Sequence, residues 1–231
     1  MDRFETMRGL LADSKYFKLV CGAGNENADE VRRLAVVYSL AGANGFDVSA
    51  KPDVVEACVE GIDLAYSYAD HFRRQIPVRP FITVSVGMPG DHHVRKAYII
   101  DDCVSCDLCI PVCPTDAIPE DLEIIPELCI GCGNCEAACP PKVAAIRYRH
   151  NGKELAELLP RCIKAGAENI ELHAAVPGDD TIMEEWAVVN DAQPDNFISL
   201  CLDRHHLSNV QLVDRIRAAH EVSGDRTIIQ A

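Results

Sequence analysis

The stretch CVSCDLCIPVCP, residues 103–114, decides how the middle of this chain folds, because it places four cysteines between positions 103 and 113. A second run, CIGCGNCEAACP at residues 129–140, repeats the pattern 26 positions later. In each run three cysteines stand at every third position, and a fourth cysteine is followed by proline. Three closely spaced thiolates on a tight loop can wrap one face of a metal cluster, whereas the fourth thiolate is held off and points away.

This spacing is typical of bacterial ferredoxins, in which the fourth cysteine of each run binds the cluster of the other run. We therefore predict two [4Fe-4S] clusters. One is expected to be held by Cys103, Cys106, Cys109 and Cys139, and the other by Cys129, Cys132, Cys135 and Cys113. The exchanged fourth ligands would tie the two halves of this region together.

Zinc is the main alternative, because two CxxC pairs could supply its four ligands. Zinc would leave cysteines over from each run, so two complete runs that end in Pro114 and Pro140 favour iron-sulfur clusters. A disulfide framework is disfavoured in the cytoplasm, where thiols stay reduced. We expect a cytoplasmic protein, because the first residues lack the order of a secretory signal and no apolar run is long enough for a membrane span.

The two runs differ at matching positions. Gly131 and Gly133 in the second run correspond to Ser105 and Asp107 in the first. Glycine lets the backbone approach inorganic sulfide and donate N–H bonds, whereas aspartate can adopt a left-handed turn but adds negative charge. Since hydrogen bonds raise the potential of a cluster and anions lower it, the cluster of the first run is predicted to be the more reducing.

Outside the cysteine runs the chain alternates β-rich and helical segments. Short β-prone segments at 96–101 and 144–149 are expected to pair across the insert. The other predicted strands are 17–24, 45–50, 79–87, 168–176, 195–204 and 226–231, and the predicted helices are 28–43, 52–72, 153–167, 181–192 and 209–224. Strands that alternate with helices favour parallel pairing through right-handed crossovers.

The predicted fold class is therefore α/β, a partial (β/α) barrel-like parallel sheet with an inserted α+β ferredoxin-like domain that holds two clusters. Residues 1–96 would form the first β/α units, 97–150 the insert, and 151–231 the remaining units. A closed barrel of this kind has eight strands, and six are predicted outside the insert. A truncated chain, a partial barrel and a barrel completed by another chain all stay open.

Strand alternation separates an aliphatic face, expected to lie under the helices, from a polar inner face. The polar residues predicted to bind a cofactor or small molecule are Thr83, Ser85, Glu171, His173 and Asp203. The same alternation places Cys21, Asp47, Ser49, Ser199 and Cys201 on the inner face, which leaves a further metal or redox role open for its cysteines. The alternative is a hydrogen-bonded polar layer without a ligand, and Cys58 and Cys162 are expected to be packing residues.

The formal net charge of −14 disfavours a nucleic-acid partner, because phosphate binding requires a basic surface. Residues 98–150 carry nine acidic groups and three basic ones, a net charge of −6. We expect a redox partner protein with a basic face, although a solvated acidic surface without a partner is the plain alternative.

Several segments resemble the light-dependent period protein A (LdpA) family of iron-sulfur proteins tied to the cyanobacterial clock. They include YFKLVCGAG (16–24), VRRLAVVYSLAGA (31–43), RPFITVSVG (79–87) and AGAENIELHA (165–174), together with the cysteine runs. The resemblance implies a protein that transfers electrons or senses redox state for its partners. This reading favours an electron carrier or redox sensor over a self-contained enzyme.

Two other functions stay open. Residues 165–175 also resemble a strand of flavin-dependent barrel oxidoreductases, so a ferredoxin-linked flavin enzyme is one alternative. An electron-relay subunit of a larger oxidoreductase complex is the other.

Overall fold

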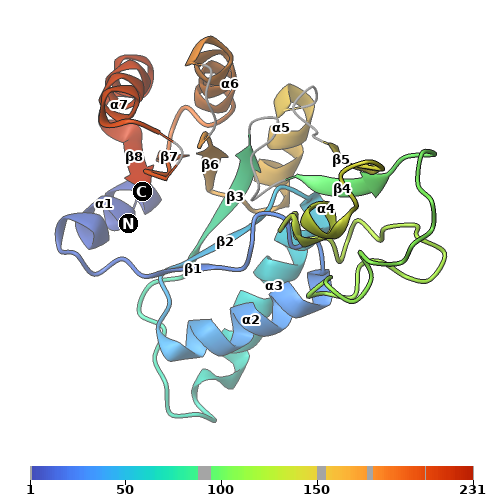
Figure 1. The fold of residues 1–231 in the computed structure, drawn as a ribbon. Coiled ribbons are helices and arrows are strands. Elements are labelled where there is room, and N and C mark those ends of the chain that lie inside the picture. The colour runs from blue at the N-terminus through green and yellow to red at the C-terminus, as the bar shows by residue number, and fades with distance from the viewer. Residues whose placement is uncertain (1, 88–94, 150–154, 176–178, 206, 231) are drawn as a thin grey trace.

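The larger part of the molecule is a six-stranded parallel sheet with the order β1-β2-β3-β6-β7-β8, which curves as a half-barrel (Figure 1). The computed structural model describes residues 2–87, 95–149, 155–175, 179–205 and 207–230. The strands are β1 (Lys18–Val20), β2 (Gly45–Ser49), β3 (Phe81–Gly87), β6 (Asn169–His173), β7 (Ile198–Cys201) and β8 (Thr227–Gln230). The predicted partial barrel of parallel strands is confirmed.

Helices cover the outer face of this sheet (Figure 1). They are α2 (Ala28–Ala41), α3 (Pro52–Ala69), α5 (Leu155–Ala165), α6 (Asp179–Ala192) and α7 (Asn209–Ser223), and a 3-10 turn at Gly224–Arg226 leads into β8. Gly42 ends α2 in the left-handed conformation at φ 100°, and Pro52 begins α3, where its fixed φ suits a helix start. Within the described residues, no helix is long and apolar enough to cross a membrane.

The main core lies between the sheet and these helices. The aliphatic residues of the strands, such as Val84, Ile170 and Leu200, are fully buried there together with Ile62 of α3 and Trp186 of α6. Cys58 and Cys162 belong to the same core, as expected for packing residues. The opposite face of each strand is therefore the inner face of the half-barrel.

Strand β1 differs from the prediction by one residue. Lys18 and Val20 line the inner face, whereas Leu19 and Cys21 pack against the core under the helices. The pairing of Val20 with Asp47 sets this register. The prediction that Cys21 faces inward was wrong, because a shift of one residue exchanges the two faces of a strand.

An N-terminal helix, α1 (Arg3–Ala12), was not predicted from the sequence. Its Met7 packs with Phe81 at the start of β3 and Phe197 just before β7, so α1 covers the amino-terminal end of the sheet. The ring of Phe4 stacks on that of Phe197 at 4.4 Å between centroids, and Arg3 binds the carboxylate of Glu168 at 2.6 Å. The signal was present in the i, i+3 and i+4 spacing of the apolar residues after Asp2, whose side chain caps the helix.

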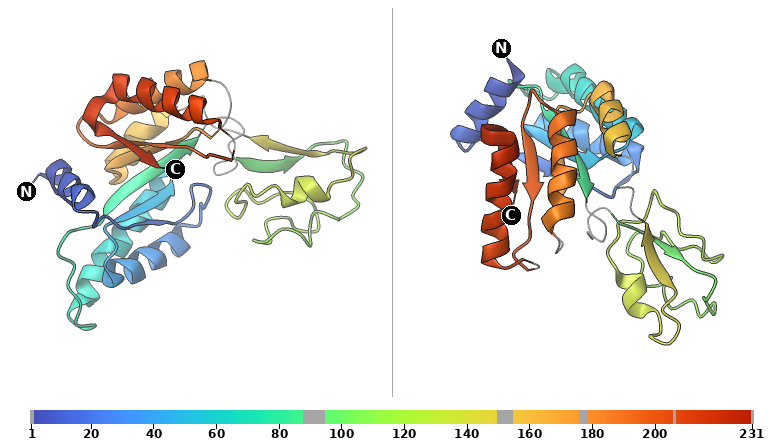
Figure 2. Two further views of the ribbon diagram at one scale, coloured as in Figure 1. Left: turned by 60° about the vertical axis from the view of Figure 1, so that its left-hand side comes forward. Right: turned by 90° about the horizontal axis from the view of Figure 1, so that it is seen from above.

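The cysteine runs form a separate small module that stands beside the half-barrel (Figure 2). Strands β4 (Lys96–Ile99) and β5 (Ile146–Arg149) pair in antiparallel fashion, as the flanking segments predict, and enclose the short helix α4 (Asn134–Ala138) and the connecting loops. This module has its own core, which includes Ala97, Ile118 and Ile146 together with several cysteines.

Candidate iron-sulfur centres and the inner face of the half-barrel

One cavity of the module is lined by the four cysteines predicted for the first cluster. Cys139 joins it from the second run. Cys103, Cys106, Cys109 and Cys139 share it with Ile99, Val104, Leu108, Leu122 and Ile146, among others. Burial raises the pKa of the Cys109 thiol, and the charges of the other three thiolates raise it further. A cation is what four such thiolates require to stay deprotonated together, so this donor set fits a metal cluster.

A second cavity is lined by the other four cysteines. Cys113 crosses to it from the first run and meets Cys129, Cys132 and Cys135. Burial raises the pKa of the Cys135 thiol to about 11, and the charges of Cys129 and Cys132 act in the same direction. The structure thus sorts the eight cysteines into two groups of four, each with one cysteine from the opposite run.

The backbone takes the same course at matching positions of the two runs. Ser105 and Asp107 have φ angles of 50° and 58°, and Gly131 and Gly133 have φ angles of 68° and 86°. Asp107 therefore adopts the left-handed turn that a glycine makes easily at Gly133. Both loops can wrap their cavities in the same way despite their different residues.

Backbone N–H groups donate to sulfur atoms in both groups. Ser105 N donates to Cys103 Sγ at 3.4 Å and Ala145 N to Cys139 Sγ at 3.3 Å, both in the first group. In the second group, Ala97 N donates to Cys129 Sγ at 3.4 Å and Ala117 N to Cys113 Sγ at 3.2 Å. These donors favour thiolate over thiol.

The two groups differ in the charges beside them. Lys96 Nζ donates to the carbonyl of Cys129 at 2.6 Å, and Arg95 Nε donates to that of Gly131 at 3.0 Å, so two cations border the second group. The exposed carboxylate of Asp107 belongs to the loop of the first group. This difference favours the predicted order of potentials, in which the first cluster is the more reducing.

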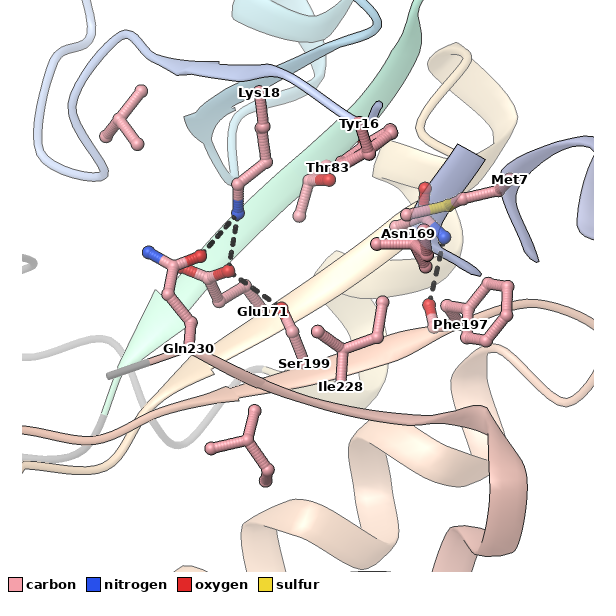
Figure 3. A pocket seen from close by; sticks show the side chains of 13 residues that line it. Met7, Tyr16, Lys18, Thr83, Asn169, Glu171, Phe197, Ser199, Ile228 and Gln230 are labelled. Carbon is pink, nitrogen blue, oxygen red and sulfur yellow. Dashed lines mark hydrogen bonds and ion pairs between the residues drawn. The ribbon is translucent and has the colours of Figure 1, made fainter. Parts of the chain in front are cut away.

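The inner face of the half-barrel holds a buried polar cluster around Lys18 (Figure 3). Lys18 Nζ lies 2.6 Å from Glu171 Oε2, 3.1 Å from Asp47 Oδ2 and 2.8 Å from Gln230 Oε1. Ser199 donates to Glu171 Oε2 at 2.7 Å, and Ser85 donates to Asp47. A cavity of about 270 Å³ lies next to this cluster, lined also by Met7, Tyr16, Asn169, Phe197 and Ile228.

The ammonium group of Lys18 donates hydrogen bonds to two buried carboxylates, those of Asp47 and Glu171. Burial and the charge of Glu171 raise the pKa of Asp47 to about 7, against the opposing effects of Lys18 and Ser85. Burial also acts upward on Glu171, but the closer ammonium of Lys18 and its hydrogen bond hold the pKa of Glu171 below its usual value. Glu171 is therefore the charged partner of Lys18 at neutral pH, and Asp47 is the carboxyl that takes up a proton first.

The structure separates the five residues that were predicted to bind a cofactor or small molecule. Thr83 and Glu171 line the cavity, Ser85 contacts Asp47, and His173 lies beside Glu171. Asp203 lies beyond the end of β7, where its side chain accepts a hydrogen bond from the backbone of His205 at 2.7 Å. The role of these five residues in binding stays a prediction.

Sequence reasoning missed Lys18 as an inner-face residue. A lone lysine in a short apolar strand is a signal in itself, because a strand that is otherwise apolar can bury an ammonium only beside carboxylates. Asp47 and Glu171 supply them from β2 and β6.

Two family models match the module. Residues 97–118 match the 4Fe-4S binding domain, and residues 121–167 match the 4Fe-4S dicluster domain. Together they span both cysteine runs, so the chain carries two [4Fe-4S] clusters in a ferredoxin-type module.

Curated relatives extend the likeness beyond the module. The chain is 34% identical over 174 residues to Light dependent period A of Synechococcus elongatus, which covers 74% of this chain and 47% of that protein. It is 44% identical over 52 residues to Ferredoxin Fdx2 of Sorangium cellulosum, which covers 19% of this chain and 52% of that protein. The chain thus spans about half the length of each of these two relatives.

Among solved structures, phosphonopyruvate hydrolase in complex with oxalate and Mg²⁺ matches 100% of this chain and 64% of its own, at a TM-score of 0.45 and 14% identity. The sequence likeness to Light dependent period A covers most of the chain and the family models cover both cysteine runs. This chain is a homologue of Light dependent period A with a two-[4Fe-4S] ferredoxin-type module.

Proposed function

We propose that this chain transfers electrons or senses redox state through its two [4Fe-4S] clusters, each bound by one of the two groups of four cysteines. The observation that carries the proposal is the grouping itself: each cavity is lined by three cysteines of one run and the fourth cysteine of the other. We also propose that residues 97–150 act as the redox unit. A [4Fe-4S] cluster supplies reversible one-electron transfer.

The residues around each cavity control access from solvent. Cys109, Cys129 and Cys135 are buried, whereas Cys106 and Cys132 are exposed. Each cluster would therefore be shielded on one side by the apolar core of the module and would approach the surface through one cysteine. The surface side is the route by which a partner could exchange electrons.

The surface near these exposed cysteines supports a protein partner. Val104 and Leu108 flank Cys106 in the sequence and are 62% and 51% exposed, and Ile130 is 42% exposed. The nine acidic residues of the module are all exposed (Asp101, Asp102, Asp107, Asp116, Glu120, Asp121, Glu123, Glu127 and Glu136). Exposed apolar side chains on an acidic module suit a partner that has a basic face.

A contact between the module and the half-barrel supports the sensing alternative. Lys96 of β4 binds the carbonyls of Gly24 in the half-barrel and Cys129 in the module, and it lies 3.6 Å from Glu26. One side chain thus touches both a proposed cluster ligand and the β1–α2 loop. A change of charge at that cluster would alter the electrostatic interactions of Lys96, and thereby its contacts with the half-barrel.

Spectroelectrochemistry of the anaerobically reconstituted protein tests the redox proposal. We expect two reversible one-electron steps in the visible absorbance of the clusters. The reduced protein should then pass electrons to cytochrome c, used as a basic acceptor, at a rate that falls steeply with added salt.

Each half of this experiment can fail separately. Clusters that are present but cannot be reduced reversibly would contradict the redox function. Reversible reduction with a rate to cytochrome c that is independent of salt would retain the redox function and refute the basic partner.

A further inference from the structure

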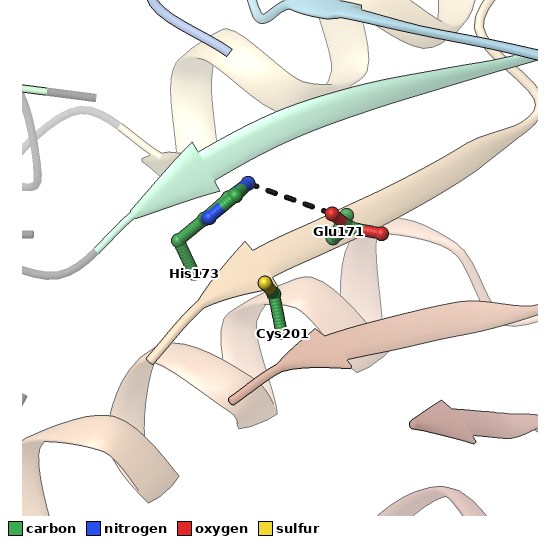
Figure 4. Close-up of side chains that lie close together, drawn as sticks. All are labelled: Glu171, His173 and Cys201. Carbon is green, nitrogen blue, oxygen red and sulfur yellow. Dashed lines mark ion pairs between the residues drawn. The ribbon is translucent and has the colours of Figure 1, made fainter. Parts of the chain in front are cut away.

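Three side chains of types that can bind metal ions meet near the carboxyl ends of β6 and β7, on the inner face of the half-barrel. Glu171 and His173 come from β6, and Cys201 is the register partner of His173 on β7. One ligand atom from each residue lies within 4.8 Å of the other two (Figure 4). The two strands are neighbours inside the parallel sheet, and their pairing fixes the positions of these residues.

The two oxygens of the Glu171 carboxylate lie in different environments. Its Oε2 accepts hydrogen bonds from Lys18 at 2.6 Å and from Ser199 at 2.7 Å. Its Oε1 is buried and accepts no hydrogen bond from the described part of the chain, and it lies 3.5 Å from Nε2 of His173. Glu171 is fully buried, so Oε1 is a polar atom enclosed by protein and directed toward His173.

We propose that Glu171, His173 and Cys201 bind one divalent ion of the zinc class. A carboxylate oxygen, an imidazole nitrogen and a thiolate sulfur are the three donor types that zinc takes from proteins. Magnesium and calcium prefer oxygen ligands, so this mixed set discriminates against them. Three protein ligands leave one position of a tetrahedral ion for water or another ligand.

The charges balance at such a site. Glu171 brings one negative charge, and Cys201 brings a second once its thiol proton is released on binding, while His173 binds as neutral imidazole. The two negative charges match a divalent cation. The bond between Lys18 and Glu171 Oε2 would remain and would orient the carboxylate, as groups behind a metal ligand commonly do.

The site is separate from the eight cysteines proposed to hold the clusters and does not depend on them. Metal analysis must therefore be made on cluster-loaded protein, in which those cysteines are occupied by iron. We expect about one zinc per chain after incubation with a zinc salt and desalting, with the iron content unchanged at about eight.

The variants Cys201→Ser and His173→Gln should each lose this zinc and keep their iron. Cys162→Ala, which alters a buried cysteine of the main core, is the matched control and should keep both metals. X-ray absorption at the zinc edge should show one sulfur neighbour at about 2.3 Å and nitrogen or oxygen neighbours at about 2.0 to 2.2 Å.

Three outcomes would overturn the proposal: no zinc above background on the cluster-loaded protein, zinc retained in both site variants, or a zinc shell with several sulfurs. Circular dichroism of each variant shows whether it folds. The two variants remove different donors, so the zinc edge of the unaltered protein and either folded variant suffice for a decision.

Discussion

At the scale of single residues, Lys96 is the cation closest to the backbone of the second cysteine group. It donates to the carbonyl of Cys129 at 2.6 Å, and only 15% of its side chain is exposed. We predict that Lys96→Met lowers the reduction potential of the second cluster by on the order of tens of millivolts, because a nearby positive charge stabilises the reduced state.

A redox titration of Lys96→Met measures the potential of its second cluster. Lys142→Met, at an exposed lysine of the same module, is the control and should leave the potential of the second cluster unchanged. An unchanged second potential in Lys96→Met would mean that Lys96 serves only to hold the module against the half-barrel.

Asp47 makes the stability of the half-barrel depend on pH. Burial and Glu171 raise its pKa from 3.8 to about 7 in the folded protein. Because the pKa of Asp47 is higher in the folded protein than in the unfolded chain, its contribution to the free energy of unfolding is fully present below pH 3.8. This contribution is lost as the pH rises through about 7. Between pH 5 and pH 8 the protein should therefore lose on the order of 2 kcal/mol more stability than Asp47→Asn.

Urea unfolding at both pH values, followed by the fluorescence of Trp186, measures this difference. Trp186 is the single tryptophan of the chain and is fully buried on α6, so it reports on the half-barrel. Equal pH dependence of the two proteins would show that Asp47 stays ionised in the folded state.

At the scale of elements, the loops that wrap the two cavities share one conformation but differ in the substitutions that they tolerate. Gly133 has a φ of 86°, and a Cβ built there would lie 2.9 Å from Nη2 of Arg95. Gly133→Ala should therefore impair the second cluster, because the backbone would be strained and Arg95 displaced. Asp107→Gly, at the matching position, should keep the first cluster and raise its potential, because it relieves the φ of 58° and removes a negative charge.

Iron content and the two potentials of these loop variants are the quantities to measure. Full occupancy of both clusters in Gly133→Ala would contradict the prediction for the second loop. A first-cluster potential that stays constant in Asp107→Gly would contradict the prediction for the first.

Helix α1 stabilises the half-barrel by covering the amino-terminal end of the sheet. Met7 is 3% exposed between Phe81 and Phe197, so Met7→Ala should cost roughly 2 to 4 kcal/mol of unfolding free energy. The exposed Glu5 of the same helix gives the control Glu5→Ala, which should change stability by less than about 0.5 kcal/mol. The same urea experiment applies, and a neutral Met7→Ala would show that α1 is not part of the cooperative unit.

The sequence predicts the positions of the helices and strands better than it predicts which side of each strand faces the helices. Alternation of apolar and polar residues was enough for β3, β6 and β7, because each carries four or more residues with a clear aliphatic side. Strand β1 has three residues, Lys18, Leu19 and Val20, which is too short for the alternation to be decided without its neighbour. The inward position of Lys18 depends on carboxylates far along the chain, which local patterns do not contain.

At the scale of the whole molecule, the cysteine module and the half-barrel each have a core of their own. The spacing of the cysteines is a local feature of the sequence, so the two groups of four could be predicted from it. In the structure each group lines one cavity. The cluster of Glu171, His173 and Cys201 forms only when β6 and β7 pair in register, so it required the structure to be recognised.

The exchange of the fourth cysteine between the two groups is tested most directly by comparing four single variants. Cys113→Ser, Cys132→Ser, Cys139→Ser and Cys106→Ser would each be reconstituted, and the electron paramagnetic resonance spectrum and potential of the remaining cluster recorded. We predict that Cys113→Ser matches Cys132→Ser, because both damage the second cluster, and that Cys139→Ser matches Cys106→Ser. If Cys113→Ser instead matches Cys106→Ser, each cluster is bound within its own run, which contradicts the exchange of the fourth cysteines.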